Sequence, residues 1–161
     1  KSVNSLSHYT DWTIANVHSG SLGWVAMISI GSLYAMAPRA LGRPEMHSPK
    51  GMELHFWLHM IGTLLYVGSM WTAGVTEALM WRATNPDGAL TYGFLDSLIA
   101  IKPMYVIRWL GGVCILSGMW VMAWNLWYTA ADARARLIKP IPVPIPEPVP
   151  HQVPAPLPAA G

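Results

Sequence analysis

Apolar and polar segments alternate along the whole chain. In order they are a polar lead-in, a first apolar helix, a loop, a second apolar helix, a second loop, a third apolar helix and a proline-rich tail, at residues 1–10, 11–37, 38–51, 52–81, 82–102, 103–131 and 132–161. Each apolar segment is long enough to cross a bilayer as a tilted helix. The pattern predicts an all-α membrane protein with three transmembrane helices.

Polar and proline residues set the predicted limits of the first helix. Thr10 or Asp11 is suited to cap its start, and Pro38 is predicted to end it. Small residues form stripes along this helix that would let another helix or a flat macrocycle approach closely. They are Ser19, Gly20, Ser21, Gly23, Ser29, Gly31 and Ser32.

The second loop carries its own structural signals. The NPDG sequence at residues 85–88 predicts a tight turn. Residues 89–101 have apolar positions on one helical stripe, which favours a separate helix lying at the membrane interface. Pro103 is well placed near the start of the third helix.

Composition and charge agree with a membrane protein. Hydrophobic residues make up 53% of the chain and charged residues only 11%, which is far from a soluble composition. No basic cluster interleaved with aromatic residues indicates nucleic-acid binding, and the single cysteine, Cys114, supports no disulfide framework. Arg39, Arg43 and Lys50 follow the first helix, so the positive-inside rule predicts that this loop and the tail are cytoplasmic.

One histidine, His18, lies inside the first apolar helix. An ionisable ring in hydrocarbon is costly unless something pairs with it or binds it, and neutral imidazole is a common ligand of haem iron. Two interpretations stand on these residues alone. His18 either binds a haem held between helices or forms a hydrogen bond to a neighbouring helix.

A resemblance to a known family favours the haem. The stretch HYTDWTIANVHSGSLGW resembles the tenth-helix signature of the catalytic subunit of cbb3-type cytochrome c oxidases, usually HYTDWTI(G/A)HVHSGALGW. The likeness continues through ELHFWL, LLYVGSMW, LMWRA, LTYGFLDS, YVIRWLGG and MAWNL, up to about Asp132. It implies that the three helices are the last three of the roughly twelve-helix bundle of haem-copper oxidase subunit I.

In that family the two histidines of the signature bind two different haems. By resemblance, His18 matches the axial ligand of the low-spin haem b, and Asn16 stands where the high-spin haem has its histidine. Residues two apart on a helix point about 200° apart, so one helix can hold a haem on each side. An amide is a poor ligand for haem iron, so Asn16 makes a normal oxygen-reducing centre doubtful.

The resemblance also implies cofactors, partners and a location. Electrons would pass from c-type cytochrome subunits through low-spin haem b to an oxygen-reducing centre of high-spin haem b and copper, coupled to proton translocation. Most ligands of that centre belong to a part of the subunit not matched here, so the chain alone is not expected to be an oxidase. Because it begins at Lys1, we expect either a part of a longer subunit or a split subunit. The expected setting is the bacterial inner membrane, among lipid.

Several alternatives remain at the centre. The high-spin haem is bound by another residue, is five-coordinate through water or is missing, or residue 16 is misassigned. A nitric-oxide-reductase-like variant is a further possibility. The competing hypothesis is a non-catalytic or split paralogue that serves only structure or electron transfer. It predicts no carbon monoxide binding.

Other polar residues in apolar surroundings are weaker candidates. Arg108 either pairs with a haem propionate or reaches lipid headgroups, and His8 is a second candidate for the propionate end. His55 and His59 have the spacing of a helical metal pair but lack a clear third ligand, and they should not touch the haem at His18. Glu77 is either a proton relay or simply solvated.

Overall fold

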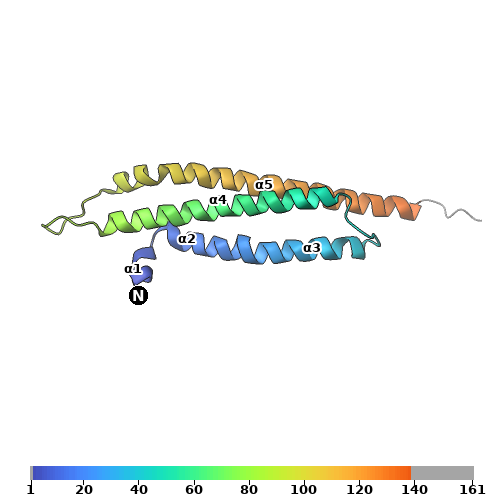
Figure 1. Cartoon of the computed structure of the whole chain (residues 1–161), viewed down its shortest axis with the longest axis horizontal. Helices are drawn as coiled ribbons and strands as arrows, with labels where there is room; N and C mark the ends of the chain where they lie inside the picture. Colours follow the sequence, from blue (N-terminus) through green and yellow to red (C-terminus); the bar gives the residue numbers. More distant parts are fainter. Residues whose placement is uncertain (1, 139–161) are drawn as a thin grey trace, which may run out of the picture.

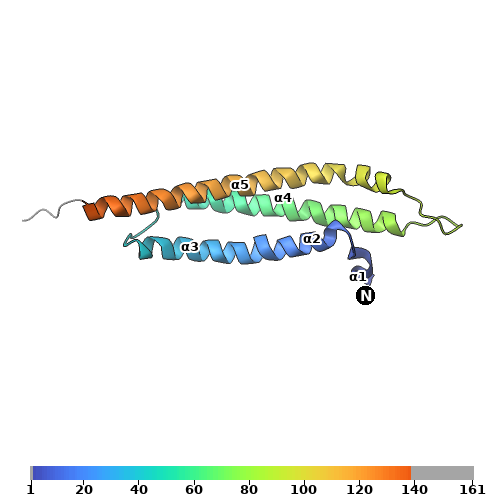
Figure 2. The same ribbon diagram turned by 180° about the vertical axis from the view of Figure 1, so that it is seen from behind.

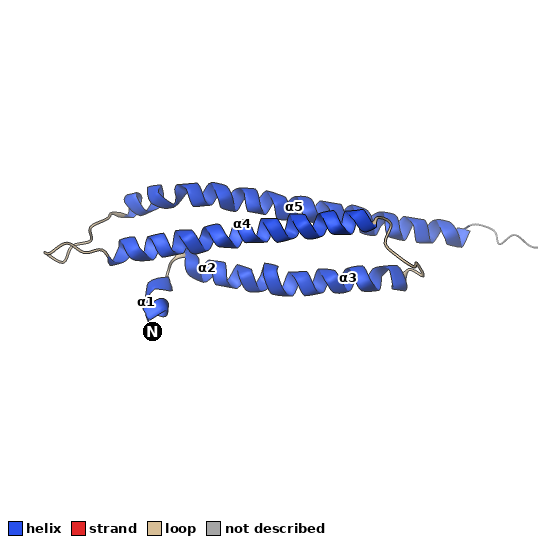
Figure 3. Ribbon diagram, viewed as in Figure 1, coloured by secondary structure: helices blue, strands red, loops and turns tan. Residues whose placement is uncertain are grey.

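Helices form nearly all of the regular structure in the part of the chain that the computed structural model describes, residues 2–138 (Figure 3). In chain order they are α1 (Ser2–Ser7), α2 (Asp11–His18), the π-helix η1 (Ser19–Ala26), α3 (Met27–Ala40), α4 (Pro49–Arg82) and α5 (Phe94–Ile138). The segments α2, η1 and α3 follow one another without a break and form a single rod from Asp11 to Ala40. An all-α fold is therefore confirmed.

Three long rods lie side by side, and α4 is the middle one (Figures 1 and 2). It packs along α5 and, on its other side, against α2 and η1. Two helices of the described residues are long and apolar enough to cross a membrane, Asp11–Ala40 and Phe94–Leu137. The predicted second span, α4, has the length but does not meet the same hydropathy criterion. Buried polar residues such as His55, His59 and Glu77 explain its lower hydropathy.

The first rod ends later than predicted, because a glycine ends it and not Pro38. Pro38 lies inside α3, and the helix continues to Ala40. Gly42 then adopts a left-handed conformation with φ 63°. The N–H of Gly42 donates to the carbonyl of Arg39, and the N–H of Arg43 donates to the carbonyl of Pro38. This is a Schellman motif, which satisfies the free carbonyls of the last turn.

The loop after α3 is fastened to the far end of α5 by side chains of the MAWNL motif and the turn after it. Asn125 exchanges two hydrogen bonds with the backbone of Ser48, at 2.9 and 2.8 Å, and Thr129 accepts one from the N–H of His47. Asn125 and Thr129 are both fully buried. Ser48 in turn caps α4 by accepting a hydrogen bond from the N–H of Gly51. A polar network therefore fixes where α4 begins.

The second loop confirms one expectation and corrects another. The turn at residues 85–88 is confirmed, because the N–H of Gly88 bonds the carbonyl of Asn85. A separate interfacial helix over 89–101 is wrong, since α5 runs unbroken from Phe94 through Pro103. Ser97 and Ile101 lie one turn apart and are buried. The helix continues through this proline although an interior proline usually costs a helix about 3 kcal/mol.

The predicted tail is also corrected at its start. Residues 132–138 continue α5, whereas 139–161 lie outside the described residues. Asp132 is held in place there by two neighbours of the first loop. His47 Nδ1 lies 2.8 Å and Arg43 3.4 Å from its carboxylate. These pairs stabilise the continuation of α5 beyond the apolar segment.

Two glycines bring α4 and α5 into backbone contact. A Cβ on Gly62 would lie 2.8 Å from the carbonyl oxygen of Gly111, and one on Gly111 would lie 2.7 Å from that of Gly62. Neither position tolerates a methyl group without moving a helix. Gly68, on the same helix α4, has nothing within 4 Å of its Cβ position.

These two sites make a matched test of the helix crossing. We expect Gly62→Ala to destabilise the protein by about 1–3 kcal/mol, the usual cost of overpacking. Gly68→Ala should be neutral or stabilising, because alanine favours a helix by up to about 1 kcal/mol over glycine. Thermal unfolding of the purified intact complex measures both. Equal melting temperatures for the two variants would contradict the close crossing.

Candidate functional site

His18 is the last residue of α2 and presents one ring nitrogen free. Its Nδ1 lies 2.9 Å from the carbonyl oxygen of Ile14, one turn earlier. Because a carbonyl only accepts, Nδ1 carries the proton and Nε2 keeps its lone pair. Among the described residues none hydrogen-bonds Nε2, and the side chain is half-buried. A histidine whose Nδ1–H is held by a backbone carbonyl is the usual form of a metal-ligating imidazole.

The rod widens into a π-helix directly after His18. Such segments are rare and are frequently found at functional sites. The sequence of η1 is rich in small residues, and two serines bond carbonyls just before it: Ser19 Oγ donates to Asn16 at 2.8 Å, and Ser21 Oγ to His18 at 3.4 Å. Gly20 and Gly23 have nothing within 4 Å of their Cβ positions. The face of η1 that they line is open.

Tyr66 of α4 connects His18 to Arg108 of α5. The His18 and Tyr66 ring centroids are 5.4 Å apart. The Arg108 guanidinium carbon lies 5.3 Å from the same tyrosine ring, and one of its nitrogens is 3.5 Å from the hydroxyl. The structure thus brings two of the predicted site residues together through a third that sequence reasoning did not single out. Tyr66 lies in the LLYVGSMW motif, which was the available clue.

A cavity of about 460 Å³ adjoins this cluster. Besides Tyr66 and Arg108 it is lined mainly by apolar or small residues of α5: Tyr105, Trp109, Gly112, Val113 and Leu116. Its lining joins apolar side chains to the Arg108 cation, whereas His18 reaches the cluster through the Tyr66 ring and does not line the hollow. A free imidazole nitrogen and a nearby cation suit the iron and the propionate of a haem. The residues present therefore fit one axial haem ligand and one propionate partner.

Two carboxylates fix the start of α2 next to the same arginine. The N–H of Asp11 donates to Glu77 of α4 at 2.9 Å, and an oxygen of Asp11 lies 3.9 Å from Arg108. The expected Thr10 cap is wrong, because its hydroxyl bonds the carbonyl of Ser7 instead. The solvated alternative for Glu77 is also wrong, because the residue is only 9% exposed. An acid on α4, and not the local sequence, caps α2.

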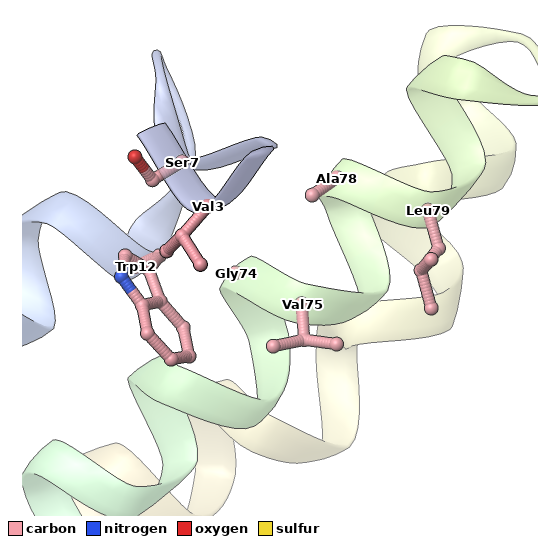
Figure 4. Close-up of a pocket in the computed structure, with 7 residues that line it drawn as sticks. All are labelled: Val3, Ser7, Trp12, Gly74, Val75, Ala78 and Leu79. Atoms are coloured by element: carbon pink, nitrogen blue, oxygen red, sulfur yellow. The ribbon is translucent and has the colours of Figure 1, made fainter. Parts of the chain in front are cut away.

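A glycine lets α2 approach α4 this closely. Gly74 lies against the backbone of Trp12, so even a methyl group there would collide with it. Figure 4 shows Trp12 beside Gly74, with Val3 of α1 covering them. This contact sets the position of His18 along α4, because the short helix α2 begins at Asp11 and ends at His18.

Asn16 is held on another face of α2, away from the His18 cluster. Its side-chain oxygen accepts a hydrogen bond from Trp71 Nε1 at 3.1 Å, and the residue is exposed. The oxygen is the only Asn16 side-chain atom with a lone pair suited to a metal. Trp71 therefore uses one of the two lone pairs of the atom through which this amide could bind iron. No feature of the sequence pattern pointed to this pair.

The other candidates lie apart from the cluster. His8 is exposed in the turn between α1 and α2, and its ring contacts Tyr9. His55 and His59 are buried further along α4 and bond other groups, Tyr34 and Leu22. Within residues 2–138 no three histidine, cysteine or acidic side chains are grouped to hold a metal ion. The cluster accordingly has the donors for one haem iron and not those of a copper site.

The described residues form an all-helical fold that has two helices long and apolar enough to cross a membrane and one histidine, His18, whose Nε2 is free. The chain belongs to the subunit I family of haem-copper oxidases, since residues 1–114 match the family described as Cytochrome C and Quinol oxidase polypeptide I. It is 55% identical over 134 residues to the Cbb3-type cytochrome c oxidase subunit CcoN1 of Stutzerimonas stutzeri, covering 83% of the chain and 28% of that protein.

Two further relatives agree. Cytochrome c oxidase subunit 1 of Rhodobacter capsulatus is 53% identical over 131 residues, covering 81% of the chain and 25% of the relative. The Cytochrome c oxidase subunit 1 homolog of Azorhizobium caulinodans is 50% identical over 133 residues, covering 83% and 24%. The chain thus spans about a quarter of the length of the curated relatives it matches.

Proposed function

We propose that this chain is the haem-ligating, three-helix part of the catalytic subunit of a cbb3-type cytochrome c oxidase, and that Nε2 of His18 is an axial ligand of its low-spin haem b. The observation that carries the proposal is the free Nε2 of a half-buried histidine whose Nδ1–H is fixed by the Ile14 carbonyl. The identity to the Stutzerimonas stutzeri subunit supports the oxidase type.

The residues of the cluster have separate roles in this proposal. The Ile14 carbonyl sets the tautomer and orientation of His18, and Tyr66 packs beside the ring and limits its rotation. Arg108 supplies a positive charge that can pair with a haem propionate, and the nearby Asp11 carboxylate helps to hold the guanidinium in place. A bound haem supplies one-electron transfer between c-type cytochrome subunits and an oxygen-reducing haem-copper centre that the rest of the subunit completes.

The same proposal places the chain in the bacterial inner membrane. Asp11–Ala40 and α5 span the bilayer, and α4 spans it between them, where its polar residues are covered by its neighbours. The loop with Arg39, Arg43 and Lys50 faces the cytoplasm. His18 then lies nearer the periplasmic end, within reach of periplasmic c-type cytochromes, and proton translocation is a property of the whole complex.

One observation favours a second candidate function. Asn16 replaces the family's other histidine, and its only metal-binding atom is engaged by Trp71. A paralogue that keeps the low-spin haem for electron transfer, without a normal high-spin haem, would have this arrangement. Such a paralogue would have no haem iron that binds carbon monoxide, whereas the oxidase would have one.

An optical experiment tests both proposals. Reduced-minus-oxidised spectra of the purified intact complex are recorded without and with carbon monoxide. A low-spin b-type band together with a carbon-monoxide-sensitive haem supports the oxidase. A low-spin band alone supports the electron-transfer paralogue, and the absence of any b-type band removes both.

The charge at Arg108 yields a further prediction. Arg108→Gln should lower the midpoint potential of the low-spin haem by about 60 mV, roughly a tenfold change in a one-electron equilibrium, because a nearby cation favours the reduced iron. Arg108→Lys should recover most of the shift. Lys102→Gln removes an exposed cation from the same helix and is the matched control. Equal shifts for Arg108→Gln and Lys102→Gln in a redox titration would contradict a local role.

A further inference from the structure

A line of buried polar side chains runs along α4 on the face that carries Tyr66, about one to three turns before it in the chain. His55, His59 and Thr63 follow one another at four-residue intervals, so they share one face of the helix. His55 is 1% exposed and His59 2% exposed. Two imidazoles buried one turn apart are costly unless their nitrogens are all satisfied. Neither ring takes part in the proposed haem site.

Each ring uses one nitrogen in a good hydrogen bond. His55 Nδ1 lies 2.8 Å from the Tyr34 hydroxyl of α3, and His59 Nε2 lies 3.1 Å from the Leu22 carbonyl of η1. A carbonyl only accepts, so His59 carries its proton on Nε2 and keeps a lone pair on Nδ1. We assign the Tyr34 hydroxyl as the donor to Nδ1, and this choice of tautomer places the proton of His55 on Nε2. The two remaining nitrogens are therefore a donor and an acceptor.

These remaining atoms have no partner within the described residues. His55 Nε2, His59 Nδ1 and Thr63 Oγ1 are all buried and unbonded. Each such atom costs about 1–3 kcal/mol when left unsatisfied. Three of them on successive turns of one helix face indicate buried water, which is the usual partner of polar atoms of this kind.

A cavity beside these side chains has room for water. It has a volume of about 670 Å³ and lies between α3 and α4, with Tyr34, Glu53, His55 and His59 among its lining residues. Glu53 and Tyr34 are its other ionisable groups, and the α5 residue in contact with His55 is Gly118, which carries none. Within residues 2–138 no third metal-ligating side chain joins the two histidines, so the pair is better suited to a proton than to a metal ion.

We propose that His55 and His59 form a water-bridged pair that takes up one proton from the cavity edged by Glu53. The bridging water accepts from His55 Nε2–H and donates to His59 Nδ1, across rings whose centroids are 5.9 Å apart. An incoming proton passes from cavity water to His59 Nδ1, which gives an imidazolium that still donates Nε2–H to the Leu22 carbonyl. This site does not depend on a haem at His18, so the two proposals can fail separately.

Nitrogen-15 magnetic resonance of the intact complex, labelled in its histidine rings, tests the site. The His59 signals are assigned by their loss in His59→Gln, and His47→Gln, at the pair with Asp132, is the matched control that should leave them unchanged. We expect a cross-peak between His59 Nδ1 and water, and a doubly protonated His59 ring when the pH is lowered across the neutral to acidic range.

Two results would overturn the proposal. One is a His59 ring that stays neutral over this range, and the other is the absence of any exchange with water. A shift of the His59 signals on adding Zn²⁺ alone, without water exchange, would instead identify a metal site and also refute it. Because His59→Gln risks misassembly, a water peak within hydrogen-bond distance of both nitrogens is sought in a high-resolution map of the wild-type complex. An empty gap or an apolar side chain there counts against the site.

Discussion

Replacing His18 with alanine is expected to abolish the low-spin b-type band of the intact complex. The ring is the only imidazole of the cluster. The Tyr66 hydroxyl is a weak-field oxygen donor and the Arg108 guanidinium has no acceptor atom, so neither would restore a low-spin band. Losing an outer hydrogen-bond partner of a metal ligand costs about 10–100-fold in affinity, so losing the ligand should cost at least about 100-fold. The reduced-minus-oxidised spectrum measures the loss directly.

A matched control separates ligation from general damage. His8 is also a histidine but is exposed, so His8→Ala should leave the band intact even if it shifts its potential. Subunit assembly is followed by gel filtration for both variants, since His18→Ala removes little packing. A low-spin band that persists in assembled His18→Ala would rule out the ligand assignment. A band lost in both variants would show that the region, and not the ligand, was disturbed.

Features that depend on local sequence were predicted well. The three long helical segments, the turn at 85–88 and the place of His18 on the first of them follow from hydropathy, proline, glycine and the family signature. The helix limits were less accurate. Pro38 and Pro103 signal breaks in isolation, but a Schellman turn at Gly42 and buried contacts at Ile101 override them.

Contacts between distant segments could not be read from the pattern. Glu77 looked like an interfacial acid, yet it caps a helix 66 residues away in the chain. Tyr66 and Trp71 lie in the LLYVGSMW motif, but neither was given a role, because an aromatic residue in a membrane helix is usually packing. Their roles become visible only when α4 lies beside α2 and brings them to His18 and Asn16.

The π-helix falls between these two cases. Its small residues were noted as a surface for close approach, and the open positions at Gly20 and Gly23 are consistent with that use. The change from α-helical to π-helical winding was not predicted. In the structure it coincides with hydrogen bonds from the Ser19 and Ser21 hydroxyls to backbone carbonyl groups. The winding shifts the register between His18 and everything after it. An ideal helix drawn from the sequence would therefore place the later glycines on the wrong face.

Replacing Asn16 with histidine is expected to create a carbon-monoxide-sensitive haem if the chain comes from an electron-transfer paralogue. The amide oxygen of Asn16 is held by Trp71, and an amide is in any case a weak ligand, whereas an imidazole is a normal one. The low-spin band should stay unchanged, because His18 lies on another face of α2. The spectrum with carbon monoxide measures the gain, and Asn16→Gln, which keeps an amide, is the matched control.

The wild-type spectrum decides how this variant is interpreted. If the wild-type complex already binds carbon monoxide, another residue or water holds the high-spin iron in place of a histidine at position 16, and Asn16→His should add little. If it does not, recovery in Asn16→His shows that a single side chain separates the two functions. A variant that keeps its low-spin band but gains no response would mean that more than residue 16 has changed. The rest of the centre would then be altered too, and the oxidase proposal would fail while the His18 assignment stands.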